Sequence, residues 1–206
     1  CEYKLSLRNA TISNSEIYNV KYGVELTDSA SIEYSILRDI SARAINGSGV
    51  STIYGNNIYS ILDNGSSGNS AVTIRDYSVF RNNIIGEING GNAAIEVGYN
   101  SIVRENIIGG YSGNQGHVGI LIREGNDQTI RNNKIGGFVA NVVLIGTKPT
   151  FSRNSFVGEL DYNNAEEFNV VIGNSNIRIN DSSRYDINFW GWSYNEEQEI
   201  ISMRNN

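Results

Sequence analysis

The sequence predicts an all-β solenoid, a parallel β-helix of about eight coils, from two repeating patterns and their constant spacing. The first pattern is a small residue, an aliphatic residue, any residue and usually a second aliphatic residue. The second is a pair of apolar residues five positions apart, with Asn favoured two positions before the second member. Each period spans 21 to 28 residues, and no helical periodicity appears before the last dozen residues.

The first pattern indicates one short strand in every coil, because side chains of a strand alternate between its two faces. Its copies are "GVEL" at 23, "AING" at 44, "AVTI" at 71, "AIEV" at 94, "GILI" at 119, and the looser "NVVL" at 141 and "NVVI" at 169.

The second pattern indicates a strand, a corner and another strand. Its apolar pairs are Leu7/Ile12, Ile32/Leu37, Ile53/Ile58, Phe80/Ile85, Val103/Ile108, Ile130/Ile135 and Phe151/Phe156. The corner position between them holds Ala10, Ser35, Asn56, Asn83, Asn106, Asn133 and Asn154. We expect these asparagines to stack from coil to coil and to bond backbone groups that the corner leaves free. The first asparagine in "RNNIIG", Asn82, is expected to be merely solvated.

The offset between the two patterns separates this fold from other repeat folds. From Val24, Ile45 and Ile95 the next apolar anchor lies eight residues on, whereas the segment that returns to the next coil varies in length. A leucine-rich repeat would need Leu at most positions, and a left-handed hexapeptide helix would need a strict six-residue step. The pattern "G-I-x-L … I-x-x-N-x-I" resembles the right-handed parallel β-helix repeat proteins of the pectin-lyase-like superfamily over residues 5 to about 190. The resemblance implies a right-handed solenoid.

The C-terminal segment "INFWGWSYNEEQEIISM" (187–203) resembles the ending of many secreted β-helix proteins. Trp190 and Trp192 would cover the open end of the last coil, since an uncovered end exposes strand edges. Residues 196–203 would form a short capping helix. The domain therefore divides into a parallel β-helix over 1–186 and a Trp/helix cap over 187–206.

Composition limits the classes of function. A net charge of −6 argues against a nucleic-acid-binding protein. The sequence contains no run of 18 apolar residues, which a membrane-spanning helix would need. The single cysteine, Cys1, excludes a disulfide framework and a Cys-rich zinc site. A cysteine at position 1 fits either the lipid-bearing residue of a bacterial lipoprotein or a fragment boundary.

An arginine-rich column is the first candidate ligand site. Equivalent positions in successive coils stack about 4.8 Å apart, so a sequence position becomes a column on the surface. The column after the first anchor reads Arg8, Glu33, Tyr54, Arg81, Arg104, Arg131 and Ser152. Three consecutive arginines predict a basic row for an acidic polysaccharide. The alternative is local neutralisation by Glu105, Asp76 and Glu124.

A second candidate site surrounds Gly98. Arg75 and Arg123 are expected two coils apart, with Gly98 leaving a gap between them and Glu96 beside it. A sugar would lie over Gly98, stack on a tyrosine and place an anionic group between the arginines. The alternative is a surface ion network of the type Arg–Glu–Arg. The expected ligand-binding residues of this site are Arg75, Tyr77, Glu96, Tyr99, His117 and Arg123.

The sequence shows no clear set of catalytic residues. Glycoside hydrolysis needs two carboxyl groups about 5 to 9.5 Å apart, and the acids here are scattered over many coils. If the protein is an enzyme, Arg75, Glu96, His117 and Arg123 are the candidates, with Tyr99 as a further base for elimination. His117 is the only histidine, and no acidic cluster like the calcium sites of pectate-lyase-like enzymes is recognisable. We expect no cofactor, with calcium as the one alternative left open.

Three functions follow as hypotheses. The first is an extracellular or cell-surface module that binds extended, acidic polysaccharide without catalysis. The second is a carbohydrate-active enzyme, either a lyase, an epimerase or a hydrolase. The third is a structural protein that self-assembles end to end.

Overall fold

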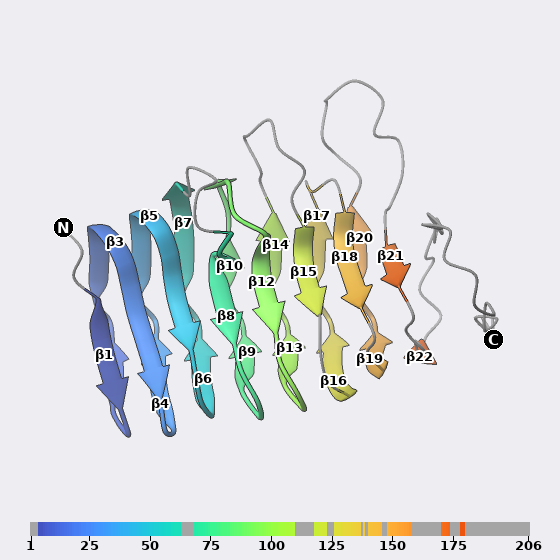
Figure 1. Ribbon diagram of the computed structural model, residues 1–206, viewed down its shortest axis with the longest axis horizontal. Coiled ribbons are helices and arrows are strands. Elements are labelled where there is room, and N and C mark those ends of the chain that lie inside the picture. Colours follow the sequence, from blue (N-terminus) through green and yellow to red (C-terminus); the bar gives the residue numbers. More distant parts are fainter. Residues whose placement is uncertain are drawn as a thin grey trace.

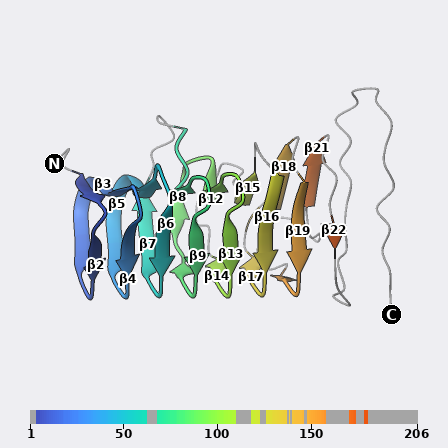
Figure 2. The same cartoon turned by 90° about the horizontal axis from the view of Figure 1, so that it is seen from below.

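The computed structural model describes residues 4–62, 68–109, 118–122, 126–136, 138, 140–145, 148–157, 170–173 and 178–179. These residues form β-strands that are all paired in parallel, and they contain no helix. Strands of successive coils stand side by side along the long axis of the molecule (Figures 1 and 2). The predicted all-β parallel solenoid is confirmed. The predicted cap over 187–206, with Trp190 and Trp192, lies outside the described residues.

One face of the solenoid is an 8-stranded sheet, which we call the third face because it closes each coil. Every coil contributes one strand to it, in chain order along the axis. Its strands are β2 (Thr11–Ser13), β4 (Ala30–Glu33), β6 (Ser51–Tyr54), β9 (Val79–Arg81), β13 (Ile102–Arg104), β16 (Asn126–Arg131), β19 (Lys148–Ser152) and β22 (Arg178–Ile179).

The other two faces belong to one 14-stranded sheet. Two long strands, β3 (Glu16–Thr27) and β5 (Ile36–Gly47), run through both faces, and β5 pairs with β7 through its first half and with β8 through its second. The first face continues from them through β7 (Asn57–Leu62), β10 (Ile84–Ile85), β11 (Ile88–Asn89), β14 (Ile107–Gly109), β17 (Lys134–Gly136) and β20 (Ser155–Val157). The second face contains β1 (Leu5–Arg8), β8 (Val72–Ile74), β12 (Ala93–Val97), β15 (Val118–Ile122), β18 (Ala140–Ile145) and β21 (Val170–Gly173).

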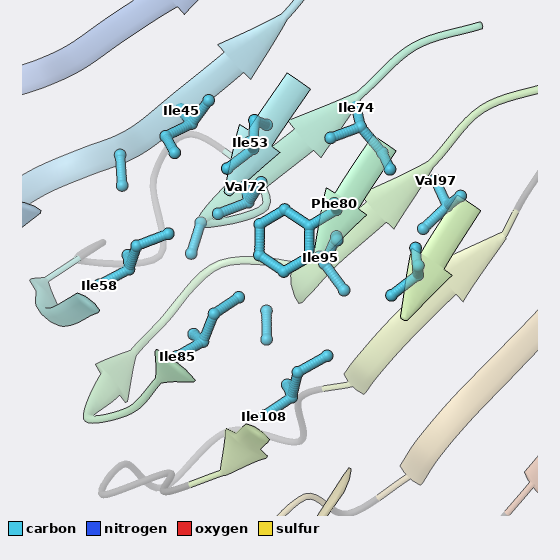
Figure 3. Close-up of a cluster of buried hydrophobic side chains, with 14 of the residues drawn as sticks. Ile45, Ile53, Ile58, Val72, Ile74, Phe80, Ile85, Ile95, Val97 and Ile108 are labelled. Carbon is cyan, nitrogen blue, oxygen red and sulfur yellow. The ribbon is translucent and has the colours of Figure 1, made fainter. Parts of the chain in front are cut away.

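Aliphatic columns fill the interior between the three faces. Ile53, Phe80 and Val103 are in register on the third face, as the second pattern predicts, and all three are fully buried. Figure 3 shows the Phe80 ring among isoleucine and valine side chains that come from all three faces. Burying an aliphatic side chain contributes roughly 1.5–3 kcal/mol, so these columns are the main source of stability.

An asparagine ladder runs along the corner between the third and first faces, as predicted. The side-chain oxygen of Asn106 accepts the backbone N–H of Asn83 at 2.8 Å, and its amide donates to the carbonyl of Phe80 at 3.1 Å. Asn106 also donates to the side-chain oxygen of Asn133 at 2.9 Å. The same contacts recur at Asn56 and at Asn133, and the asparagines are buried. The ladder therefore satisfies backbone groups that the corner would otherwise leave unpaired.

A serine ladder at the opposite end of the third face was not predicted. The hydroxyls of Ser51 and Ser78 are 3.0 Å apart, and the backbone N–H of Ser78 donates to the hydroxyl of Ser101 at 3.2 Å. The Ser101 hydroxyl donates to the carbonyl of Arg75 at 2.8 Å. These serines are buried and do for this corner what the asparagines do for the other.

The predicted register of the first coil is wrong. Ile12 pairs with Ile32, and Ile17 pairs with Leu37, so the corner residue of this coil is Ser15 rather than Ala10. Leu7 instead pairs with Leu26 on the second face. The five-residue spacing could not decide this, because Leu7/Ile12 and Ile12/Ile17 satisfy it equally.

Candidate functional site

The arginine row on the third face is confirmed in its central part. Arg81 is in register with Arg104, and Arg104 with Arg131, while Tyr54 and Ser152 extend the column on either side. Successive members lie about 4.8 Å apart along the axis. We call Arg81, Arg104 and Arg131 the arginine row.

Arg8 does not belong to this column. It pairs with Thr27 on the second face, and its guanidinium contacts the Asp28 carboxylate at 2.7 Å. Ser13 occupies the position in the column next to Glu33. The error has the same origin as the misassigned register of the first coil.

Aromatic rings lie beside one end of the arginine row. The guanidinium carbon of Arg81 lies 4.2 Å from the ring centroid of Tyr54, and the Tyr34 ring meets Tyr54 edge-on at 4.9 Å between centroids. The Tyr34 ring also covers Gly55, where an added Cβ would lie only 2.9 Å from it. This stack of Tyr34, Tyr54 and Arg81 is exposed on its outer side, since Tyr34 is 53% exposed. Sequence reasoning missed Tyr34, although it directly follows Glu33 of the column.

A hydrogen bond between the two tyrosines separates their acidities. The contact with Tyr54 raises the pKa of Tyr34, and the same hydrogen bond, with smaller contributions from Asn82 and Arg81, lowers the pKa of Tyr54.

The charges of the row are only partly neutralised. Arg104 is paired with Glu105 at 2.9 Å, as the neutralisation hypothesis expects. Arg131 is exposed and forms no ion pair with any residue that the structure describes. Asp76 lies at the corner before the third face, across the face from the arginine row. There its carboxylate accepts the backbone N–H of Tyr99 at 3.1 Å. Glu124 lies outside the described residues.

The second candidate site is present in part. Arg75, Tyr77 and Tyr99 are exposed at the corner before the third face, and the backbone N–H of Tyr77 donates to the carbonyl of Tyr99 at 2.9 Å. An added Cβ at Gly98 would lie 3.1 Å from the Cα of Arg75 and from the Asp76 carboxylate. Close packing is therefore sufficient to explain this glycine. His117 and Arg123 lie outside the described residues.

Glu96 does not join Arg75 in an ion pair among the described residues. Its carboxylate instead accepts the hydroxyl of buried Ser70 at 3.1 Å. Glu96 continues a polar row on the second face, in register with Thr73 and Asn46. The row reaches Glu25, whose carboxylate contacts Lys4 at 2.7 Å, and this hydrogen bond lowers the pKa of Glu25.

The two candidate sites flank one surface, the outer side of the third face. Partly buried Val79, Ile102 and Thr129 form its central column, with the arginine row after them and Tyr77 and Tyr99 before them in the chain. A short strand of three residues spans roughly 7–10 Å. A ligand lying on this face can therefore contact both groups at once, which the sequence did not indicate.

No group of three or more His, Cys, Asp or Glu residues that could hold a metal ion occurs among the described residues. Within the same residues, no helix is long and apolar enough to cross a membrane.

Comparison with known proteins gives no relative. No protein-family model, curated protein or solved structure matches this chain.

Proposed function

We propose that this protein binds an extended acidic polysaccharide along the outer side of its third face, and that it does so without catalysis. The observation that carries the proposal is the register of Arg81, Arg104 and Arg131. Guanidinium groups bind carboxylate or sulfate groups through two parallel hydrogen bonds. A row with one cation about every 4.8 Å suits a linear polyanion that lies along the solenoid axis.

The tyrosines supply the second kind of contact. Sugar rings stack on aromatic faces, and Tyr34 and Tyr54 present rings beside Arg81. Tyr77 and Tyr99 do the same across the face, with Arg75 next to them. The proposed ligand-binding residues therefore include both candidate sites, the arginine row with its tyrosines and the group around Gly98.

The placement of acids favours binding over hydrolysis. Glu33 and Glu105, the carboxylates that border the row, belong to coils three steps apart, which is about 14 Å. Hydrolysis of a glycoside requires two carboxyl groups within about 9.5 Å. Elimination by Arg75 or Tyr99, with His117 and Arg123, is the alternative that the experiment below tests.

The proposal includes a family and a location. The parallel coils and the asparagine ladder support the sequence resemblance to the pectin-lyase-like superfamily. An extracellular or cell-surface location follows from that resemblance. End-to-end assembly remains the structural alternative, and no cofactor is part of the proposal.

The experiment compares binding of acidic and neutral polysaccharides by isothermal titration calorimetry. We expect Arg131→Ala and Arg81→Ala each to weaken binding of the acidic polymer by about tenfold or more, as loss of a charged hydrogen bond implies. Arg8→Ala is the matched control, because Arg8 is an exposed arginine outside the row. Equal affinity in all variants would refute the site, and release of unsaturated uronates would establish the lyase instead.

A further inference from the structure

We propose that the first face is a self-association surface, on which two copies of this chain pack face to face in opposite directions. One outward column of this face reads Glu16, Ile36, Asn57, Ile84, Ile107 and Lys134, in register through six successive coils. Its isoleucines are unusually open, with exposed fractions of 38% for Ile36, 48% for Ile84 and 50% for Ile107. The inference is independent of polysaccharide binding, which concerns the third face.

A strip without side chains lies next to one half of this column, whereas Tyr18, Arg38 and Tyr59 hold the equivalent positions in the other three coils. Two residues further along each strand, Gly86, Gly109 and Gly136 follow one another from coil to coil. A Cβ added to Gly86 would lie 3.6 Å from the nearest atom, a carbonyl oxygen, and one added to Gly109 would lie 3.5 Å from its nearest neighbour. Close packing thus does not require these glycines, in contrast to Gly98. Their effect is a flat surface from which Ile84 and Ile107 project.

The charges at the two ends of these six coils determine the partner; Ser155 of β20 continues the register beyond Lys134. At one end Glu16 contacts Arg38 at 2.7 Å, and Arg38 also contacts Asp39, so that this group carries a net negative charge. At the other end Lys134 is exposed and has no acidic partner among the described residues. A two-fold axis that lies in the interface, parallel to the strands and between the coils of Asn57 and Ile84, brings the negative end of each copy onto the positive end of the other.

The same axis pairs two of the three isoleucines with each other, whereas Ile84 meets Asn57. It places Ile36 of one copy over Ile107 of the second copy, and Asn57 over Ile84, twice each by symmetry. Such an interface is isologous, as in most homodimers. A parallel arrangement would bring like charges together at both ends, so the column specifies the antiparallel one.

The size of the surface predicts weak association. Six coils extend about 24 Å along the axis, and the face is roughly 10 Å wide. This is below the area that a permanent dimer buries, so the dimer should form only at high protein concentration.

Sedimentation velocity of the full chain, without any polysaccharide, tests the proposal. We expect a monomer at low micromolar concentration and a growing dimer fraction toward millimolar concentration. Ile84→Lys should abolish the dimer, whereas Val50→Lys should leave it intact. Val50 is 47% exposed, like Ile84, but it lies between β5 and β6 and outside the column.

A charge exchange provides a test that does not depend on the apolar variant. Lys134→Glu alone should weaken dimerisation severalfold, and adding Glu16→Lys should restore it, because the two ends then exchange signs. A wild-type chain that stays monomeric at near-millimolar concentration would overturn the proposal. So would a dimer that survives Ile84→Lys, or a Lys134→Glu defect that Glu16→Lys does not rescue.

Discussion

The residue that follows the arginine-row position has a backbone role in seven successive coils of the described structure. It adopts a left-handed conformation, with φ near 50–68°, at Asn14, Tyr34, Gly55, Asn82, Glu105, Asn132 and Arg153. This conformation lets the chain leave the third face at a sharp angle, and it costs roughly 1 kcal/mol for most residues. Asn and Gly tolerate it best. Asn82, which the sequence led us to regard as merely solvated, is therefore a turn residue.

Substitution of Asn82 tests this role. We expect Asn82→Ala to lower the free energy of unfolding by about 1 kcal/mol, because alanine resists positive φ. Asn82→Gly should change it by less than about 0.5 kcal/mol, since glycine adopts this conformation freely. Urea denaturation followed by circular dichroism measures both. Equal losses in the two variants would mean that the Asn82 side chain, and not its backbone, is what matters.

At the scale of the strand and corner, the asparagine ladder bonds the backbone groups that a corner leaves unpaired, as capping side chains do at the ends of helices. The side chain of each asparagine bonds two backbone groups of the preceding coil and the side-chain oxygen of the next asparagine, as Asn106 shows. Removing one therefore leaves two buried backbone groups of the preceding coil without partners. The serine ladder has fewer and longer contacts, so we expect it to tolerate substitution better.

Substitution of Asn106 tests the ladder. Asn106→Ala should lower the free energy of unfolding by about 3 kcal/mol or more, because the backbone N–H of Asn83 and the carbonyl of Phe80 lose their partners. Asn57→Ala is the control, since Asn57 is exposed, and it should cost less than about 0.5 kcal/mol. Chemical denaturation of both variants gives the comparison, and similar losses would contradict a structural ladder.

At the scale of the whole molecule, the coils are joined by a continuous core and not by separate units. Phe80 is the largest fully buried side chain among the described residues. Its ring lies in the interior, near the middle of the described coils (Figure 3). Glycine allows the closest approach between coils: a Cβ at Gly23 would lie 2.3 Å from the carbonyl oxygen of Ala44. Neighbouring coils are therefore in backbone contact and should unfold together.

Truncation of Phe80 tests this continuity. We expect Phe80→Ala to lower the free energy of unfolding by about 3–5 kcal/mol, because the cavity opens between several coils. Phe80→Leu should cost clearly less, since it keeps most of the volume. Thermal unfolding monitored by circular dichroism should remain a single transition in both variants. Separate transitions in Phe80→Ala would show that the coils on either side are independent units.

The spacing of apolar residues was enough to predict the parallel solenoid, the asparagine ladder and the alignment of Arg81, Arg104 and Arg131. These features repeat, and alternation along a strand decides which side chains face inward. The first coil was misassigned because five-residue spacing fits two registers there, and only pairing with the next coil chooses between them.

Only the tertiary structure decided which residues meet across coils. The segments between strands vary in length, so the sequence did not reveal that Ser51, Ser78 and Ser101 form a ladder, or that Glu96 contacts Ser70 instead of Arg75. It also did not reveal that Ile36, Ile84 and Ile107 project from one open face. In a solenoid, the repeat of apolar residues along the sequence determines which side chains lie inside. Contacts on the surface depend on how each coil is placed on its neighbour.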